Sequence, residues 1–306
     1  MAIIDVRGAI DMHCHSGPAL FQRIGDAREI SWRAKQAGMR GILFKAHHTS
    51  TYDRAYFVNS EFRRIAAQTG EPLAYEAFGS ITLTHYVGGI NPRAVAVALE
   101  GGCKEVFMPT LDSAHHARLF GGTGAYGIAS MVTADSGAGA GLTILDPEGQ
   151  LTPETREVVA LVARHKALLG TSHLSPEEQL ALADYAIPGG AALVVTHAYF
   201  LPGADLSFYQ TMADKGAIIE LCGAAAFPVA LHQGGGMTLK QARELIEAVG
   251  PDRCVLGTDA GQPFNPWPDE ALRLFAQLLH EIGVSEEHLH QMMVANPRRL
   301  LHLADG

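Results

Sequence analysis

Both the fold and the chemistry of this chain follow from one short stretch, Asp11-Met12-His13-Cys14-His15. It continues the apolar pair Ala9-Ile10 and is ended by Ser16-Gly17-Pro18, so it forms the C-terminal tip of a short buried strand. Alternate side chains of a strand share a face, so the imidazoles of His13 and His15 point the same way. Two imidazoles aimed together are half of a metal site, although such a pair alone fits two neighbouring core or surface histidines equally well.

The composition indicates a folded, soluble protein. With 306 residues, of which 47% are hydrophobic and 18% charged, the chain can bury a large core. It has no charged leader with a cleavage site and no apolar run long enough to span a bilayer, so we expect a cytoplasmic protein with no membrane partner. The four cysteines lack CxxC spacing, which disfavours a zinc ribbon, a redox motif or a disulfide framework.

The net charge limits the partners further. At −9 and without a basic stripe, the chain offers no surface for nucleic acid or anionic lipid. A small-molecule substrate is therefore the expected partner, and a homo-oligomer remains open. The composition departs from the ordinary in its 15 histidines, whose positions carry the functional argument.

Apolar, β-rich runs alternate with longer helical patterns along the chain, a rhythm typical of βα units. Several helical patterns begin with a capping side chain and proline, as at Asn91-Pro92 and Ser175-Pro176. The expected strands are Ala9–His13, Gly41–Lys45, Leu73–Gly79, Glu105–Pro109, Ala167–Thr171, Ala191–Thr196, Ala217–Leu221 and Cys254–Thr258. The expected helices are Ala27–Ala37, Tyr52–Gln68, Pro92–Leu99, Pro153–Arg164, Pro176–Ala186, Ser207–Asp214, Leu239–Val249 and Pro268–Glu281.

Eight such units match the size of a (β/α)8 barrel, and the continuous apolar run Ala191–Val195 fits a parallel sheet covered on both faces. A doubly wound open sheet is the alternative, but the Gly-rich phosphate loop that it needs after the first strand is missing. We predict a single barrel domain over residues 1–306. The glycine-rich segment Leu111–Leu151 is expected to be a lid or interface loop after the fourth strand, and Glu286–Val294 and Pro297–Leu303 a C-terminal helical extension.

Further polar residues keep phase with these strands. His173 follows the fifth strand, His197 ends the sixth and Asp259 ends the eighth. Together with the first-strand pair, all of them lie at C-terminal tips, which converge on one mouth in a barrel. Four imidazoles and a carboxylate can surround one divalent ion or two there.

This ordered set, His-x-His, then His, then His, then Asp, resembles the amidohydrolase superfamily of metal-dependent barrel enzymes along the whole chain. The closing Ala295–Leu301 is similar to the asparagine-proline segment that often ends such proteins. The resemblance implies that the first-strand pair and Asp259 hold the more buried metal. It also implies that His173 and His197 hold a second metal or orient substrate, and that Asp259 exchanges a proton with the attacking water.

The chain departs from that family on its fourth strand. Binuclear members bridge their metals there with a modified lysine or a glutamate, but Glu105–Thr110 has neither at its tip and its only acid lies at the other end. The second strand instead ends Lys45-Ala46-His47-His48, with Lys45 and His47 on one face. Lys45 is a substrate-carboxylate anchor, a carbamylated bridge or the partner of an acid. We rank the anchor first, because a carbamate needs two metals and an ammonium only an anion.

Loop residues near the mouth are the remaining candidates for binding substrate. At least one of the two histidines after the second strand is expected to be a solvated loop residue. Asp11 shares the alternation of His13 and His15, so it either supports them or lies one layer deeper. Besides Lys45, the loop candidates are His47, His48, His85, His115, His116 and Arg118.

Together these residues predict metal-assisted hydrolysis. A zinc-type ion lowers the pKa of bound water from about 15.7 to about 7. Asp259 takes the proton and passes it to the leaving group, with Lys45 and His197 as further catalytic candidates. The expected substrate is a small anionic or cyclic amide, lactam, lactone or ester. The expected cofactor is zinc, with manganese, iron or nickel as alternatives, at one or two ions per chain.

Two other functions remain open. The first is metal-dependent decarboxylation or hydration on the same kind of barrel, which product analysis would distinguish from hydrolysis. The second is a barrel that keeps a metal only for stability or ligand binding. Asp259 disfavours this second alternative, because a structural site needs no proton-shuttling carboxylate beside an open coordination position.

Overall fold

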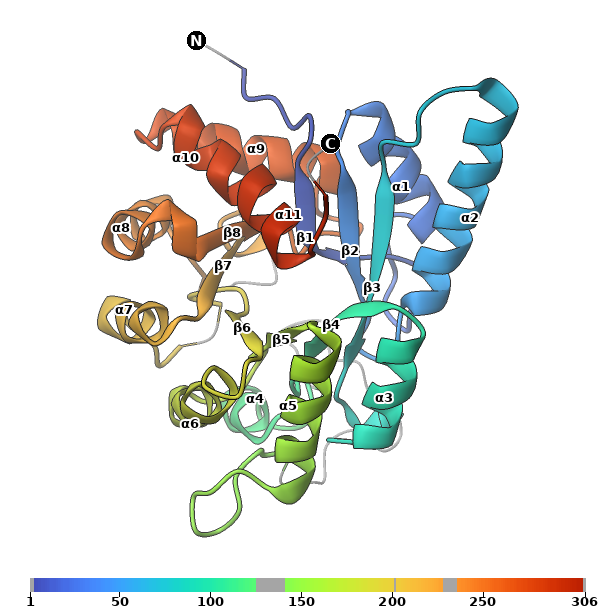
Figure 1. The fold of residues 1–306 in the computed structure, drawn as a ribbon. Coiled ribbons are helices and arrows are strands. Elements are labelled where there is room, and N and C mark those ends of the chain that lie inside the picture. Colours follow the sequence, from blue (N-terminus) through green and yellow to red (C-terminus); the bar gives the residue numbers. More distant parts are fainter. Residues whose placement is uncertain (1–2, 125–140, 201, 228–235, 305–306) are drawn as a thin grey trace.

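The chain forms a closed ring of parallel strands inside a ring of helices. A computed structural model describes residues 3–124, 141–200, 202–227 and 236–304 (Figure 1). Its eight-stranded sheet has the order β1 to β8, with every strand parallel to the next along the chain. The ends of β1 and β8 meet through a parallel bridge between Cys14 and Ala260, which closes the sheet. The predicted (β/α)8 barrel is confirmed.

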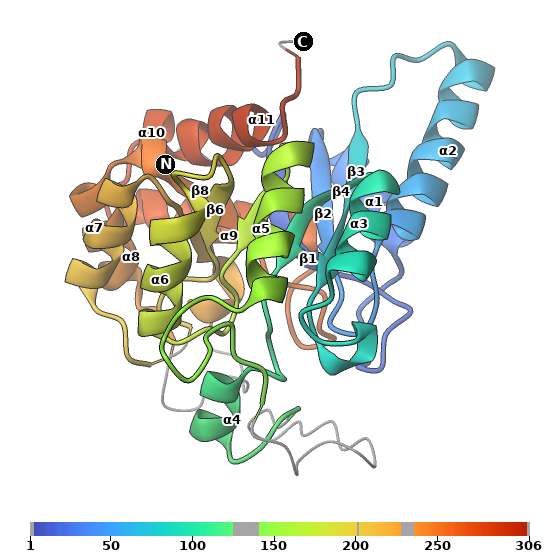
Figure 2. The same ribbon diagram turned by 60° about the horizontal axis from the view of Figure 1, so that its bottom comes forward.

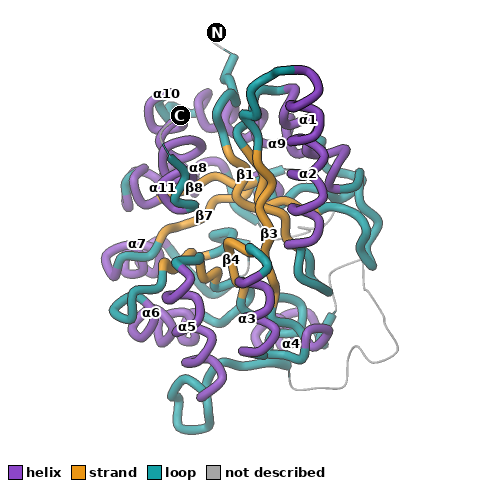
Figure 3. Tube along the Cα trace, turned by 45° about the vertical axis from the view of Figure 1, so that its right-hand side comes forward, coloured by secondary structure: helices purple, strands orange, loops and turns teal. Residues whose placement is uncertain are grey.

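The strands line the centre and the helices cover them on the outside (Figure 3). The strands are β1 (Ile10–His15), β2 (Gly41–Lys45), β3 (Glu76–Thr82), β4 (Cys103–Phe107), β5 (Leu168–Gly170), β6 (Ala192–Val195), β7 (Ile218–Cys222) and β8 (Cys254–Gly257). The helices are α1 (Ala27–Gln36), α2 (Tyr52–Thr69), α3 (Pro92–Glu100), α4 (Ala114–Phe120), α5 (Pro153–His165), α6 (Pro176–Ala186), α7 (Leu206–Lys215), α8 (Leu239–Val249), α9 (Pro268–Glu281), α10 (Glu286–His290) and α11 (Asn296–Leu300). None of the helices described here combines the length and apolar character of a membrane span.

Two segments differ from the sequence prediction. The third strand begins at Glu76 and ends at Thr82, whereas the sequence predicts Leu73–Gly79. Gly79 lies inside the strand. A glycine is needed there because the backbone of Tyr52 passes close by, so that a Cβ at Gly79 would lie 2.7 Å from the Tyr52 Cα. The sequence analysis ended the third strand at Gly79, but this glycine instead marks a close approach between α2 and β3.

The segment predicted as one long loop after the fourth strand contains the helix α4. The Ser113 hydroxyl caps this helix by accepting a hydrogen bond from the His116 N–H. Of the two glycine-rich runs in this segment, residues 121–124 are described, whereas most of residues 136–141 lies outside the described residues. Figure 2 shows α4 at one end of the barrel and α11 at the other.

An apolar cluster packs inside the barrel, and the C-terminal helix contacts it. Leu300 and Leu301, at the end of α11, contact this cluster, and the Asn296 side chain donates hydrogen bonds to the carbonyls of Cys254 (2.7 Å) and Pro251 (2.8 Å). The asparagine-proline segment is thereby bound to the start of β8. The interior residues from the strands are Ile10, Met12, Leu43, Phe78, Phe107, Leu168, Val194, Ile218 and Val255.

We expect Asn296→Ala to destabilise the protein by about 1–3 kcal/mol, because two buried carbonyls lose their donor. Denaturant unfolding followed by circular dichroism measures this loss. The exposed Glu287→Ala on α10 serves as the control and should change little. An unchanged unfolding midpoint for Asn296→Ala would show that α11 is not held by these two bonds.

Candidate metal centre

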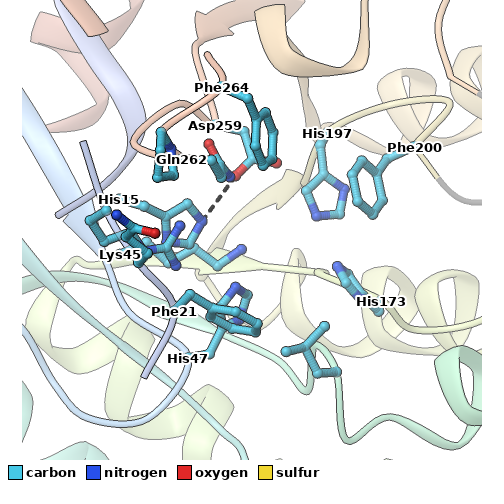
Figure 4. Close-up of a pocket in the computed structure, with 14 residues that line it drawn as sticks. His15, Phe21, Lys45, His47, His173, His197, Phe200, Asp259, Gln262 and Phe264 are labelled. Carbon is cyan, nitrogen blue, oxygen red and sulfur yellow. Dashed lines mark hydrogen bonds and ion pairs between the residues drawn. The ribbon is translucent and has the colours of Figure 1, made fainter. Parts of the chain in front are cut away.

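Two histidines of β1 meet a carboxylate that follows β8. One Asp259 oxygen, Oδ1, lies 2.9 Å from His15 Nε2 and 3.3 Å from His13 Nε2. All three residues are buried, and one ligand atom of each lies within 4.8 Å of the others. Figure 4 shows His15 and Asp259 of this group. Two imidazole nitrogens and a carboxylate oxygen at this spacing form a suitable partial ligand set for a divalent ion.

A break in the strand pairing aims both histidines into the barrel. The register of β1 against β2 shifts between Asp11 and Cys14, which is the mark of a β-bulge. Ile10 and Met12 both contact the interior cluster, so Asp11 between them points the other way. The bulge then returns His13 to the inner face.

Asp11 therefore does not lie one layer deeper on the face of the histidines, and that interpretation is wrong. Its carboxylate accepts hydrogen bonds from the Thr258 N–H (2.9 Å), the Thr258 hydroxyl (2.6 Å) and the His13 N–H (3.1 Å). Burial raises the pKa of Asp11 to about 7, against the effect of these donors. The alternative interpretation fits, because Asp11 joins the backbone of β1 to the segment that carries Asp259.

The backbone is strained where the ligands leave their strands. Asp259 has a φ of 48° and His197 a φ of 38°, in the left-handed region that non-glycine residues rarely adopt. Asp259 is held there because its N–H donates to the His13 carbonyl at 2.7 Å. Gly261 allows the turn to pass close to β1, since a Cβ at this position would overlap the His15 carbonyl oxygen.

Lys45, at the end of β2, reaches the same centre. Its Nζ lies 3.1 Å from His13 Nε2 and 4.5 Å from the centroid of the Phe107 ring. Only 1% of Lys45 is exposed, and burial lowers the pKa of its ammonium although Asp259 opposes the shift. Phe107 is the last residue of β4, so a phenyl ring occupies the fourth-strand wall of the site.

Glu220 on β7 is a site residue that the sequence analysis missed. Its Oε2 lies 3.0 Å from His13 Nδ1 and accepts a hydrogen bond from the His197 N–H at 3.0 Å. A carboxylate beside Nδ1 leaves Nε2 of the same imidazole available to a metal. The sequence did contain a signal for Glu220: it is an acid inside the apolar run Ala217–Leu221. A buried charge requires a partner, so this acid had to lie beside another polar group.

His173 and His197 face the same cavity from β5 and β6. Their ring centroids are 5.0 Å apart, and that of His197 is 5.7 Å from that of His13. Burial lowers the pKa of both well below the usual value, so both are neutral, as metal ligation requires. His173 Nδ1 lies 2.9 Å from Nδ1 of His116, a buried residue of α4.

One nitrogen in this cluster lacks a partner. His197 Nε2 is buried and makes no hydrogen bond within the part of the chain that the structure describes. Buried polar atoms are nearly always satisfied, so an unpaired imidazole nitrogen beside other ligand atoms marks a position for a bound group. The residues present therefore fit a divalent metal.

The ligand cluster opens into a cavity of about 320 Å³. His47 lines this cavity and stacks on His15, with ring centroids 4.9 Å apart. Lys45 lines it too, so two of the predicted substrate-binding residues lie at the cavity beside the five predicted metal ligands. Arg23, which the sequence analysis did not single out, is a further lining residue.

Three other predicted substrate-binding residues, His48, His85 and Arg118, do not line this cavity. His48 packs instead against Tyr86, with ring centroids 4.8 Å apart. His85 is exposed at the start of a surface turn, where its N–H donates a hydrogen bond to Asp112. Arg118 lies on the exposed side of α4. These three residues were predicted to bind substrate from their position in loops near the mouth. Loop position alone does not determine where a side chain points.

Comparison with known families identifies the class of barrel. Residues 236–303 match the family model described as Amidohydrolase, and the predicted resemblance to the amidohydrolase superfamily is confirmed. The chain belongs to the family described as a family of unknown function (DUF6282), whose model matches residues 8–220. A search of the curated proteins found no match.

Several solved structures share the fold. An amidohydrolase from Pseudomonas aeruginosa is 15% identical, with a TM-score of 0.60 and 96% of each chain covered. The probable dipeptidase PvdM from the same organism is 12% identical, with a TM-score of 0.63 over 97% of this chain and 94% of that one. The 2,6-dihydroxybenzoate decarboxylase from Rhizobium is 12% identical, with a TM-score of 0.52 over 97% of this chain and 99% of that one. Such identities show the common barrel and not a common reaction.

We expect Glu220→Gln to weaken metal binding about 10- to 100-fold while the protein stays folded, because a neutral amide no longer orients and polarises His13. Titration of the metal-free protein with Zn²⁺ against a competing chelator measures the affinity. Glu76→Gln, an acid at the start of β3, is the matched control and should bind as the wild type does. Equal affinities for both variants would remove Glu220 from the metal centre.

Proposed function

We propose that this protein is a metal-dependent hydrolase of small amides, lactams, lactones or esters. The observation that carries the proposal is the convergence of His13, His15 and Asp259, at 2.9 and 3.3 Å, beside the unpaired His197 Nε2. His13, His15 and Asp259 would hold the metal, together with His173 or His197. Neutral imidazoles with one carboxylate suit zinc, with manganese, iron or nickel as alternatives. A small-molecule substrate and a cytoplasmic location complete the proposal.

A metal held by these residues would make water more acidic and polarise the substrate carbonyl. Asp259 then acts as general base and acid, taking a proton from water and delivering it to the leaving group. Burial raises the pKa of Asp259, but its contacts with His13 and His15 outweigh burial and hold that pKa well below its usual value, so the carboxylate is ionised. Lys45 can hold an anionic substrate group or the developing negative charge.

We further propose a single metal per chain. A bridge between two metals needs a carboxylate or carbamate on the wall, and the Phe107 ring lies there, 5.4 Å from the ring of His13. Glu105 of the same strand is buried in the barrel interior, and burial with the nearby Glu220 raises its pKa well above the usual value. A protonated acid of this kind is a poor metal ligand. Lys45 accordingly serves as an anchor and not as a carbamylated bridge.

Decarboxylation of a small acid is the second candidate. Lys45 favours it, because an ammonium 3.1 Å from His13 Nε2 can hold a substrate carboxylate beside the ligands. One structure with this barrel is a 2,6-dihydroxybenzoate decarboxylase. Released carbon dioxide would identify this reaction, whereas incorporation of oxygen from labelled water into the acid product identifies hydrolysis.

We expect Asp259→Asn to lower kcat/KM about 10²- to 10⁴-fold, because the amide cannot move a proton. The assay is turnover of the best substrate from a panel of small esters, lactones and amides. Asp269→Asn is the control, since Asp269 pairs with Arg33 (3.1 Å) on helices outside the cavity. Intact turnover in Asp259→Asn would contradict the mechanism.

Chelation is expected to abolish turnover, and added Zn²⁺ to restore it, because only the metal would lower the pKa of water and polarise the substrate carbonyl. Under the single-metal proposal, which rests on the phenyl wall at Phe107, elemental analysis of purified protein should give about one metal per chain. Activity that persists after complete chelation would overturn the proposed function. Two metals per chain would overturn only the single-metal proposal.

A further inference from the structure

The cavity contains a cation that the proposed reaction does not use. Arg23 lies between β1 and α1, and its Nη2 is 3.4 Å from His15 Nδ1. Its Cζ lies 5.4 Å from the centroid of the Phe21 ring. Both neighbours line the cavity, so the guanidinium forms part of the wall next to a predicted metal ligand.

The charges of this wall favour an anionic ligand. Among the described residues that line the cavity, Arg23 and Lys45 are cations and Asp259 is the only acid. Asp259 lies within ion-pair distance of the two β1 histidines. An excess of positive charge in a partly buried cavity attracts an anion more strongly than the same charges on an open surface, where salt screens them.

Besides the histidines and the polar Gln22 and Gln262, the rest of the wall is apolar and fits a small, flat body. Phe264 stands at the opening with 48% of its surface exposed, and Phe21 and Phe200 face the same space (Figure 4). Leu111 and Pro263 add to this surface. A volume of about 320 Å³ lies at the small end of ligand pockets and suits a single ring with short substituents.

We propose that the substrate is a small, ring-sized molecule bearing a carboxylate, and that Arg23 binds this carboxylate. The identity of the reacting bond rests on the proposed hydrolase function, but the recognition does not. A planar guanidinium can donate two parallel N–H bonds to a carboxylate, which a neutral amide or alcohol of the same shape cannot match. This assignment replaces the carboxylate-anchor role of Lys45: with the carboxylate on Arg23, Lys45, which is 1% exposed and in contact with His13, holds the developing negative charge at the reacting end.

Isothermal titration calorimetry on the metal-free, full-length protein tests this recognition without turnover. The probes are benzoate and benzamide, which have nearly the same shape but differ in charge. We expect the wild type to bind benzoate at least about tenfold more tightly than benzamide, as a charge-assisted hydrogen-bond pair provides. Arg23→Gln should lose this preference and Arg23→Lys should retain part of it.

The matched control is Arg28→Gln, because Arg28 is an exposed arginine on α1 whose Nη2 lies 3.9 Å from Glu61. It should keep the wild-type preference. Thermal melts establish that each variant is folded, and if Arg23→Gln is not, Arg23→Lys must still weaken benzoate binding several-fold. A wild type that binds both probes equally, or an Arg23→Gln protein that retains the preference, overturns the inference.

Failure of this inference can be told apart from failure of the proposed function. If benzoate binding depends on Arg23 but no carboxylate-bearing amide, lactone or ester is hydrolysed, the recognition stands and the hydrolase function falls. If hydrolysis depends on metal but Arg23→Gln raises KM equally for carboxylate-bearing and neutral substrates, the function stands and the recognition falls.

Discussion

The contact between the ends of β1 and β8 is the constraint on which the rest of the structure depends. Asp259 N–H donates to the His13 carbonyl and His15 N–H donates to the Ala260 carbonyl, which completes the ring of strands. The same junction brings the Asp259 carboxylate onto the imidazoles of the β1 histidines. Barrel closure and assembly of the ligand cluster are therefore one event, and the left-handed backbone at Asp259 is tolerated because closure holds it.

Buried polar groups make the site rigid because each must find a partner. Glu220 links the imidazole of His13 to the backbone of His197, and so connects β1, β6 and β7. Asp11 performs the corresponding task between β1 and the segment after β8. The candidate ligands are thus oriented by carboxylates that do not line the cavity, whereas Arg23 and the aromatic wall, which we propose to bind the substrate, do line it.

Much of this arrangement could be predicted from local patterns. The alternation of apolar runs and helical patterns located every strand. The phase of the polar residues at strand ends predicted which five side chains come together, because parallel strands in a barrel end at one mouth. Their role as metal ligands stays a prediction. Glu220 escaped because its partner His13 is 207 positions away in sequence and nothing local records the pairing. Asp11 was misassigned because alternation assumes a regular strand, and a bulge leaves no local signature in side-chain pattern. Loop residues such as His85 have no periodicity from which to infer direction.

The interior packing of Leu300 and Leu301 bears on how the protein matures in the cell. The β1 imidazoles leave the ribosome before Asp259 and before the helix that fills the base of the barrel. Until Asp259 follows, a nascent chain carries the histidine pair without its carboxylate, and domains generally fold as units. Under the proposed function, tight metal capture would therefore require the folded barrel, and the metal would load after Asp259 has been synthesised.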